Sequence, residues 1–528
     1  MSLVRALISL LSAAVLIAVP TLTVWLASSL IAFHGGPREV ALAGGLLLFP
    51  ILPVLWEWRA SRAWKRKQAR RKQFVGAPKR ALRLFPRLVL RTLLLCLAFS
   101  GAMVAKFPRV TFSALATRGD WFLEPGERGQ PWRDGVFAMA SALEGLHRLA
   151  NPNPYVTKAD GDLLAKIDVT PTGETPVVPS GASARWRKLT DEERAAIEGV
   201  RPTSLDAGSE PVVAWKDDDD KEVEHQGQTP PPPPAEEPVV VETGGTHWPW
   251  TDEVSATVRG MNPQDETSIA AVAQYIRARE PEPFKRVKAL HDWVVTRLEY
   301  DLDSLKPRQR KPQDANSVFL GRVAVCEGYA RLLVELGRLT GDQIVYIGGD
   351  VREENGAAAP VGHAWNGVKV NGLWYLMDAT WDDPVGPDGK SRSYRTDYLF
   401  IPPDVAIFSH FPDDARWQLL PAKLSRGDFL RQPFARPGIA KEQLTLERPE
   451  RASVDVTDSV AFEVDNPLRR YLLVEYRTPG GSVECGVSND AHVSLRCPVS
   501  ASGHAVLFSN GERSGTFGQV VSIAVTRR

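Results

Sequence analysis

Three long apolar runs near the N-terminus dominate the hydropathy pattern of the chain. Residues 6–31 carry no charged side chain, and residues 40–56 and 88–105 form two further runs. A helix needs about 20 apolar residues to cross the hydrocarbon core of a bilayer, so the runs predict three membrane-spanning helices. The first run is longer than the apolar region of a cleaved signal peptide, which favours an anchor over a removed leader.

A block of basic residues lies between the second and third runs. From Glu57 to Arg91 the sequence has 13 Lys or Arg residues and one acidic residue. The positive-inside rule places such a loop in the cytoplasm, and three spans then put the rest of the chain on the outer side of the membrane. If residues 88–105 do not span, because they include Arg91, the rest stays in the cytoplasm. We interpret the block as a topology and anionic-lipid signal and not as a nucleic-acid site, because apolar runs flank it.

Polar and proline-rich sequence follows the anchor region of residues 1–110. Residues 111–246 include the proline run 230–234 and the acidic run 217–220, and they show little periodicity beyond a short amphipathic stretch at 133–150. Polyproline resists both helix and sheet and acts as a stiff spacer. We therefore expect residues 111–246 to be a largely disordered linker outside the membrane.

Short runs with period-two alternation occupy the C-terminal residues 436–528. Turn signals recur between them, for example at 479–481 and 510–511, which predicts a small antiparallel β-sandwich of the immunoglobulin-like kind. Cys485 and Cys497 flank a predicted turn. They can form a disulfide if this domain lies in an oxidising compartment, and two free buried thiols are the alternative.

Composition narrows the classes of protein further. Of the 528 residues, 43% are hydrophobic and 24% are charged, which is ordinary for a globular protein and excludes a fibrous or wholly disordered chain. Only four cysteines occur, so a disulfide-dense scaffold is excluded as well. The sequence has no Cys-x-x-Cys pair and no paired histidines of the kind that bind zinc. We expect no metal and no cofactor.

Cys326 precedes a strongly amphipathic segment. Apolar residues recur after it at helical spacing, at Tyr329, Leu332, Leu333 and Leu336. The cysteine therefore falls at or near the first turn of a buried helix. The partial positive charge of a helix N-terminus favours a thiolate over a thiol, which suits a nucleophile. From this residue alone, a structural cysteine would be the default interpretation.

A histidine and an aspartate follow in a predicted β-hairpin. His363 begins a strand that ends near Val370, and Asp378 ends the next strand, with a turn at Asn371 and Gly372. With the turn centred between residues 370 and 371, His363 and Asp378 are close to cross-strand neighbours. A carboxylate opposite a histidine can accept its N–H and stabilise the imidazolium.

The residues around this trio resemble a known family. The strings Cys-Glu-Gly-Tyr-Ala at 326–330, His-Ala-Trp at 363–365 and Asp-Ala-Thr-Trp at 378–381 are similar to the transglutaminase-like core of papain-type cysteine enzymes. The string at 408–420 resembles the segment after the core in the kyphoscoliosis-peptidase branch. The resemblance implies a catalytic domain at 247–435. We therefore expect an α+β protein with N-terminal transmembrane helices, this core, and a C-terminal all-β sandwich.

The resemblance also implies that Cys326, His363 and Asp378 are a catalytic triad. Cys326 would attack an amide carbonyl, His363 would pass the proton to the leaving amine, and Asp378 would orient His363. The acyl group would then go to a lysine amine or to water, so crosslinking and hydrolysis both remain open. The expected partners are a protein or peptide substrate and the lipid bilayer, with no nucleic acid. The alternative is a membrane-tethered scaffold or binding protein that keeps the fold without turnover.

Several residues near the motifs have weaker claims to a role in catalysis. An oxyanion hole would use the N–H of Cys326 and one upstream donor, for which Tyr300 and Trp293 are the candidates, and each of these also suits a core position. Other polar residues are expected to have structural roles at the surface, in packing or in loop capping: His291, His410, Asp382 and Asp383.

Overall fold

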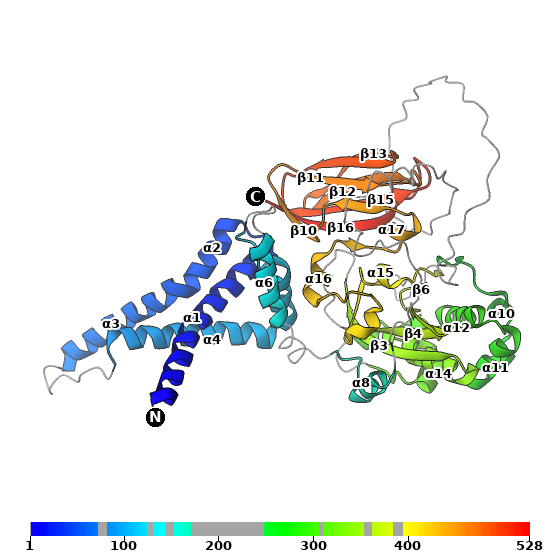
Figure 1. Cartoon of the computed structure of the whole chain (residues 1–528), viewed down its shortest axis with the longest axis horizontal. Helices are drawn as coiled ribbons and strands as arrows, with labels where there is room; N and C mark the ends of the chain where they lie inside the picture. Colours follow the sequence, from blue (N-terminus) through cyan, green and yellow to red (C-terminus); the bar gives the residue numbers. More distant parts are fainter. Residues whose placement is uncertain are drawn as a thin grey trace, which may run out of the picture.

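The computed structural model is of the mixed α+β class, and three parts follow one another along the chain (Figure 1). N-terminal helices come first, an α+β core lies in the middle, and the C-terminal part consists of β-sheets. At this level the fold class expected from the sequence is confirmed. The structure describes residues 2–71, 82–123, 130–143, 153–167, 169, 248–305, 310–352, 362–383 and 394–528.

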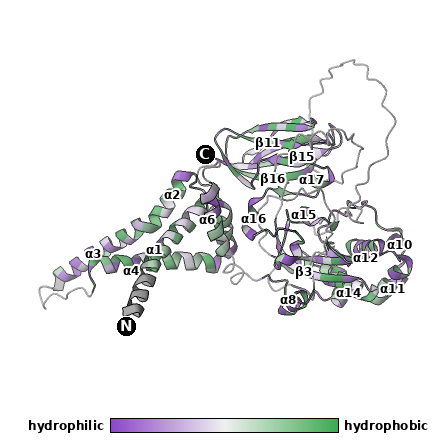
Figure 2. Ribbon diagram, viewed as in Figure 1, coloured by the Kyte–Doolittle hydropathy of each residue, from purple (hydrophilic) through white to green (hydrophobic). Residues whose placement is uncertain are grey.

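The N-terminal helices form three continuous stretches that are long enough to cross a membrane. They are α1 (Ser2–Phe33), α2 (Arg38–Leu46), the π-helical η1 (Leu47–Ile51), α3 (Leu52–Arg71) and α4 (Leu84–Lys106). Within the described residues, three stretches are long and apolar enough to span a bilayer: Ala14–Phe33, Arg38–Ala69 and Leu84–Lys106. Figure 2 shows apolar residues along much of these helices. The three apolar runs of the sequence fall within these elements.

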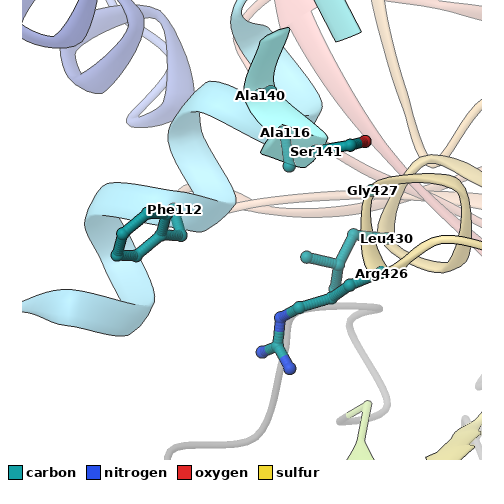
Figure 3. A pocket seen from close by; sticks show the side chains of 7 residues that line it. All are labelled: Phe112, Ala116, Ala140, Ser141, Arg426, Gly427 and Leu430. Carbon is teal, nitrogen blue, oxygen red and sulfur yellow. The ribbon is translucent and has the colours of Figure 1, made fainter. Parts of the chain in front are cut away.

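Part of the predicted linker is helical. Among the described residues within or next to 111–246, the helices are α5 (Pro108–Arg118), α6 (Gln130–Ala142) and α8 (Lys158–Ala165). α5 and α6 contact α16 (Arg426–Arg431) around a small cavity of about 20 Å³ lined by Phe112, Ala140 and Leu430 (Figure 3). The proline and acidic runs lie in residues 170–247, outside the described part of the chain.

The α+β core is built on a five-stranded antiparallel sheet with the strand order β6–β5–β4–β3–β7. Its strands are β3 (Gln343–Val351), β4 (His363–Val370), β5 (Leu373–Met377), β6 (Leu399–Ile401) and β7 (His410–Pro412). The helices are α10 (Ala256–Arg259), η3 (Pro263–Asp265), α11 (Ile269–Arg279), α12 (Pro283–Arg297), η4 (Asp303–Leu305), α13 (Ala315–Gly321), α14 (Cys326–Thr340), α15 (Pro403–Ala406) and η5 (Ala415–Gln418). A short parallel pair, β1 (Glu299–Tyr300) and β2 (Val323–Ala324), leads into α14.

Helix α14 is held in place by its apolar face. Leu332, Leu333 and Leu336 are fully buried in one cluster with side chains of α12 and of β4. The helix ends at Gly341, whose φ of 86° is the left-handed conformation that favours glycine at a helix C-terminus. Because packing fixes the helix against the sheet, it also fixes Cys326, the first residue of the helix.

The β4–β5 hairpin forms as expected, but with a different register. Asn371 and Gly372 both have positive φ, so they are the two central residues of a tight turn. Val370 pairs with Leu373, and the hairpin is centred between residues 371 and 372 instead of between 370 and 371. The turn residues are those predicted, and the centre of the hairpin lies one position beyond the assumed one. His363 and Asp378 are diagonal and not directly opposite neighbours.

The C-terminal part contains two β-sheets that share one apolar core. The first sheet has the order β10–β16–β15–β12–β13, with β8 paired to β16, and the second has the order β14–β11–β9. The elements are β8 (Phe434–Ala435), α17 (Gly438–Lys441), β9 (Thr445–Arg448), β10 (Ser453–Val456), β11 (Ser459–Asp465), β12 (Tyr471–Thr478), β13 (Gly481–Ser488), β14 (His492–Pro498), β15 (Gly503–Asn510) and β16 (Gly518–Arg527).

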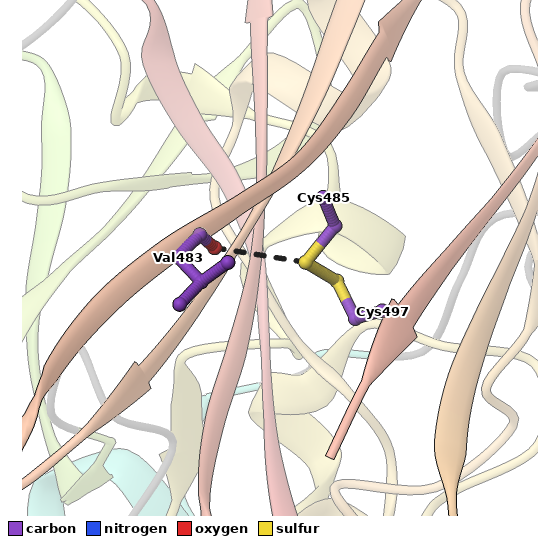
Figure 4. Close-up of a disulfide and its surroundings, with 3 residues drawn as sticks. All are labelled: Val483, Cys485 and Cys497. Atoms are coloured by element: carbon purple, nitrogen blue, oxygen red, sulfur yellow. Dashed lines mark hydrogen bonds between the residues drawn. A yellow bond between two sulfur atoms is a disulfide. The ribbon is translucent and has the colours of Figure 1, made fainter. Parts of the chain in front are cut away.

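Cys485 and Cys497 form a disulfide that joins the two sheets (Figure 4). Cys485 lies in β13 of the first sheet and Cys497 in β14 of the second, with their Cα atoms 5.0 Å apart. Of the two alternatives left open by the sequence, the structure therefore has the disulfide. Cys96 and Cys326 are the free cysteines, and both are buried.

Candidate active site

Cys326 is placed by close packing around the start of α14. The Gln313 side chain accepts a hydrogen bond from the Val325 N–H at 3.0 Å, which fixes the residue before the cysteine. Gly328 has no room for a side chain, because a Cβ there would lie 2.6 Å from the Ala324 Cβ. Glycine at position 328 therefore lets the first turn of α14 pack closely against β2, which precedes it. Cys326 itself is only 1% exposed.

His363 and Asp378 are in direct contact. His363 is the first residue of β4, Asp378 follows β5, and His363 Nε2 lies 2.6 Å from Asp378 Oδ2. Both residues are buried. The other carboxylate oxygen accepts hydrogen bonds from the backbone N–H groups of Thr380 at 2.9 Å and Trp381 at 3.3 Å. The loop after β5 therefore holds the carboxylate, and the carboxylate holds the imidazole ring.

Cys326 lies beside these two residues. The Cys326 sulfur lies close enough to the His363 ring to favour its protonated form, and Nε2 of this ring faces Asp378. Burial lowers the pKa of His363, but the Asp378 carboxylate and the Cys326 sulfur outweigh it and raise the pKa to about 10. Burial raises the pKa of Asp378, and the two histidines around it bring that pKa below its ordinary value. At neutral pH the ring is therefore protonated and the carboxylate ionised.

A second histidine contacts the same carboxylate. His410 Nε2 lies 3.0 Å from Asp378 Oδ2, and His410 Nδ1 lies 2.8 Å from the Ser409 hydroxyl oxygen. Burial lowers the pKa of His410, and the nearby carboxylate opposes this only in part. The neutral ring can thus donate from Nε2 to Asp378 while Nδ1 accepts from Ser409. Sequence reasoning expected a structural His410 and missed this contact.

The two candidate oxyanion donors lie in different surroundings. Trp293 is fully buried in the core, where its ring stacks on Phe319 with the ring centroids 5.7 Å apart. Tyr300, the last residue of β1, lies beside the site, because its side chain packs against the buried cluster that contains Cys326. Burial and the nearby Cys326 sulfur raise the pKa of Tyr300, so its hydroxyl keeps the proton. Tyr300 is therefore the better placed of the two donors.

The carboxylates of Asp382 and Asp383 support the loop after β5 and do not contact His363. His291 Nε2 lies 3.1 Å from Asp382 Oδ2, and Asp382 also accepts a hydrogen bond from the Tyr398 backbone N–H at 2.9 Å. Asp383 accepts a hydrogen bond from the Tyr329 hydroxyl at 2.6 Å. His291 is fully buried, so a surface position for it was wrong and a packing role fits.

The side chains around Asp378 are also of types that bind metals. One ring nitrogen each of His363 and His410 and one oxygen of Asp378 lie within 4.8 Å of one another. The distances from Asp378 Oδ2 to Nε2 of His363 and of His410 are 2.6 and 3.0 Å. These are hydrogen-bond distances, so a proton and not a metal ion fits between each pair of atoms. A second group of possible ligands in the C-terminal part consists of Glu447, Asp465 and His492.

Comparison with known proteins places the site in a known domain type. Residues 270–379 match the model of the Transglutaminase-like superfamily. Kyphoscoliosis peptidase from Mus musculus and that from Homo sapiens are each 25% identical over 185 residues, which are 34% of this chain and 28% of each relative. The match thus spans less than a third of the length of these curated relatives.

A solved structure is also similar to part of the chain. It is a putative cysteine protease from Cytophaga hutchinsonii, 21% identical in sequence, with 27% of this chain and 50% of that chain covered and a TM-score of 0.19. Cys326, His363 and Asp378 all lie within the residues that match the superfamily, and His410 lies beyond them. Residues 270–379 are a transglutaminase-like superfamily domain, distantly homologous to kyphoscoliosis peptidase.

Proposed function

We propose that the chain is a membrane-anchored cysteine enzyme that transfers or hydrolyses the acyl groups of protein or peptide amides. The observation that carries the proposal is the buried Cys326 sulfur beside the hydrogen-bonded pair of His363 and Asp378. The Cys326 sulfur bonds to the amide carbonyl carbon, and the C–N bond breaks as His363 gives its proton to the leaving amine. A lysine amine or a water then attacks the thioester and returns a proton to His363, and the sulfur leaves as thiolate.

The developing oxyanion would be stabilised by two donors. The Cys326 backbone N–H is at the N-terminus of α14, and Tyr300 packs against the buried cluster that contains Cys326. When a substrate oxygen lies between them, the N–H and the phenol O–H can both donate to it. Such preorganised donors act most strongly in a site that excludes water, and this site is buried.

His410 is proposed as a positioning residue for Asp378. Its Nε2–H donates to the oxygen that also accepts from His363, so it limits rotation of the carboxylate. Phe408, two residues before it, is buried in the same apolar cluster as the two C-terminal sheets. The C-terminal part, which we propose is an immunoglobulin-like sandwich, thus supports the strand that carries His410.

The enzyme is proposed to act on the outer side of a membrane that it crosses three times. The middle of the basic block, residues 70–83, lies between the second and third candidate spans, and the positive-inside rule assigns it to the cytoplasm. The third span then carries the rest of the chain to the opposite side. The disulfide between Cys485 and Cys497 supports the same orientation, because disulfides persist in oxidising compartments. A reporter that is active only in the periplasm, fused after Val110, tests this orientation. An inactive reporter would place the domain in the cytoplasm.

The proposed activity is tested with a glutamine-containing peptide and a labelled amine. Label on the peptide reports acyl transfer, release of ammonia without label reports side-chain hydrolysis, and new peptide termini report proteolysis. Cys326→Ala and His363→Ala are expected to abolish whichever activity is seen while the melting temperature stays close to that of the wild type. Wild-type turnover that survives in Cys326→Ala would exclude the mechanism, and a scaffold role would then account better for the fold.

A further inference from the structure

The proposed nucleophile is covered by a segment from outside the catalytic domain. Cys326 is only 1% exposed, and it shares a small buried cluster with Tyr155. Tyr155 belongs to residues 153–167, which we call the strap and which lie far upstream of the superfamily match at 270–379. A substrate amide has no access to the sulfur while the strap holds this position.

Asn153 fastens the strap to the two strands next to the site. Its side-chain amide donates to the carbonyl oxygens of Gly349 in β3 at 3.1 Å and of His363 in β4 at 3.3 Å. Its side-chain oxygen accepts a hydrogen bond from the Tyr155 N–H at 3.0 Å. The strap is therefore anchored on the backbone of the proposed catalytic histidine, with Tyr155 only two residues further on.

Tyr155 fills the space beside the thiol. It is 6% exposed and packs in one cluster with Cys326, Tyr346 and Ala364. Burial and the nearby Cys326 sulfur raise its pKa to about 12, so it is a neutral phenol at physiological pH. Its backbone carbonyl accepts a hydrogen bond from the Tyr346 hydroxyl at 2.5 Å. The Tyr155 carbonyl is therefore bonded to Tyr346 and not to the proposed oxyanion donors.

Arginine contacts hold the rest of the strap. Asp160 in α8 accepts hydrogen bonds from two nitrogens of Arg331 in α14, at 3.2 and 3.0 Å. Arg416 donates to the backbone carbonyls of Leu164 at 3.1 Å and Ile167 at 3.3 Å. These carbonyls are at the end of α8, where a helix favours a cation. The strap is thus attached at both ends as well as beside the thiol.

Two glycines of the α+β core, Gly348 and Gly362, leave room for the strap. A Cβ at Gly348 would lie 2.0 Å from Val156 Cγ2, and a Cβ at Gly362 would lie 2.4 Å from Asn153 Oδ1. The three atoms nearest to a Cβ at Gly348 all belong to the strap. Gly348 lies within β3 and does not have positive φ, so its backbone conformation does not require glycine. The missing side chain at this position therefore serves the approach of the strap.

We propose that the strap is an internal inhibitor that occupies the place beside Cys326 where the acyl donor would bind, which we call the donor groove, and that turnover requires the strap to leave. This inference rests on the proposed function, because it takes this groove to be the place where the amide binds. The contacts also indicate the class of donor that fits. It is an extended peptide with a side-chain amide that can bind the Gly349 and His363 carbonyls and an aromatic ring that packs beside Ala364.

The test uses the full chain in detergent micelles and follows alkylation of Cys326 by iodoacetamide, read by peptide mass. Tyr155→Ala removes the aromatic side chain that packs beside Cys326. Gly348→Ala adds a methyl group to β3 that clashes with Val156 of the strap. Each is expected to raise the alkylation rate about tenfold or more, because the reactive population is the strap-free one. Asp160→Asn should give a smaller increase. The matched variant Asp162→Asn, an exposed acid on the same helix, should stay within about twofold of the wild type.

Rescue in trans separates release of the strap from a general loosening of the fold. A synthetic peptide of residues 153–167 should slow the alkylation of the Tyr155→Ala chain again, and the same peptide carrying Tyr155→Ala should not. Equal alkylation in the wild type and all variants, or no protection by the peptide, would overturn the inference. If Cys326 becomes reactive but no chain turns over an amide, the covering by the strap stands and the proposed function fails. Amide turnover that rises in parallel with alkylation supports both.

Discussion

Replacing Asp378 by asparagine isolates the contribution of its negative charge to the hydrogen-bonded pair of His363 and Asp378. The amide keeps the shape of the side chain and can still accept a hydrogen bond from the Thr380 N–H, but it removes a negative charge 2.6 Å from His363. Raising the pKa of His363 from 6.5 to about 10 corresponds to about 5 kcal/mol of preference for the protonated ring. If Asp378 supplies about half of this free energy and Cys326 the rest, loss of the Asp378 charge lowers kcat/KM about a hundredfold.

The assay is the pH profile of kcat/KM for a labelled amide, recorded in the wild type and in the Gly348→Ala background so that the strap does not limit the rate. The wild-type rate should fall as the pH rises through about 10, because His363 then loses the proton that the leaving amine needs. In Asp378→Asn this alkaline limb should move down by about two pH units. An unmoved limb together with a near wild-type rate would refute the reasoning.

Asp383→Asn is the control for loss of a buried carboxylate near the site. Asp383 is five positions after Asp378 and is also buried, but its side chain accepts from the Tyr329 hydroxyl, which an amide oxygen can do as well. The control should keep kcat/KM within about threefold of the wild type and leave the alkaline limb in place. An equal loss in both variants would attribute the effect to disruption of the loop.

The contacts around the site and in the C-terminal sheets give three further predictions. His410→Ala should lower kcat about tenfold with little change in KM, and His410→Gln, whose amide can still donate to Asp378, should recover most of the rate; equal losses would point to packing alone. Tyr300→Phe removes only the hydroxyl and should lower kcat by about 10- to 100-fold, because an oxyanion donor acts mainly in the transition state; a change confined to KM would count against it. Cys485→Ser should lower the free energy of unfolding by about 2–3 kcal/mol, because the disulfide closes a short loop. Urea unfolding with and without reductant measures this, and a wild type indifferent to reductant would disagree.

The chemistry of the site could be predicted from the sequence because local patterns place each residue on its element. The helical spacing of Leu332, Leu333 and Leu336 located Cys326 at the start of a helix, and α14 begins at that residue. The Asn-Gly pair located the hairpin that carries His363, although the centre of the hairpin lies one position beyond the assumed one. Such patterns locate elements more securely than they locate the pairing between them.

Contacts between distant segments could not be predicted in the same way. His410 reaches Asp378 because β7 pairs with β3, and nothing in the sequence around residues 408–420 encodes that pairing. The strap has few buried side chains, chiefly Tyr155 and Leu164, so its sequence resembled that of a linker. Its position depends on hydrogen bonds and ion pairs with residues far along the chain, which leave no periodic pattern.

The central claim is that the acyl group of an amide becomes bonded to the sulfur of Cys326. Quenching the wild-type and Gly348→Ala chains in acid during turnover, with peptide mass mapping afterwards, measures this directly because acid preserves a thioester. We expect the mass of the acyl group on the peptide that contains Cys326, and no such addition in His363→Ala. Amide turnover without any adduct at Cys326 in either chain, or an adduct on another residue only, would contradict the account.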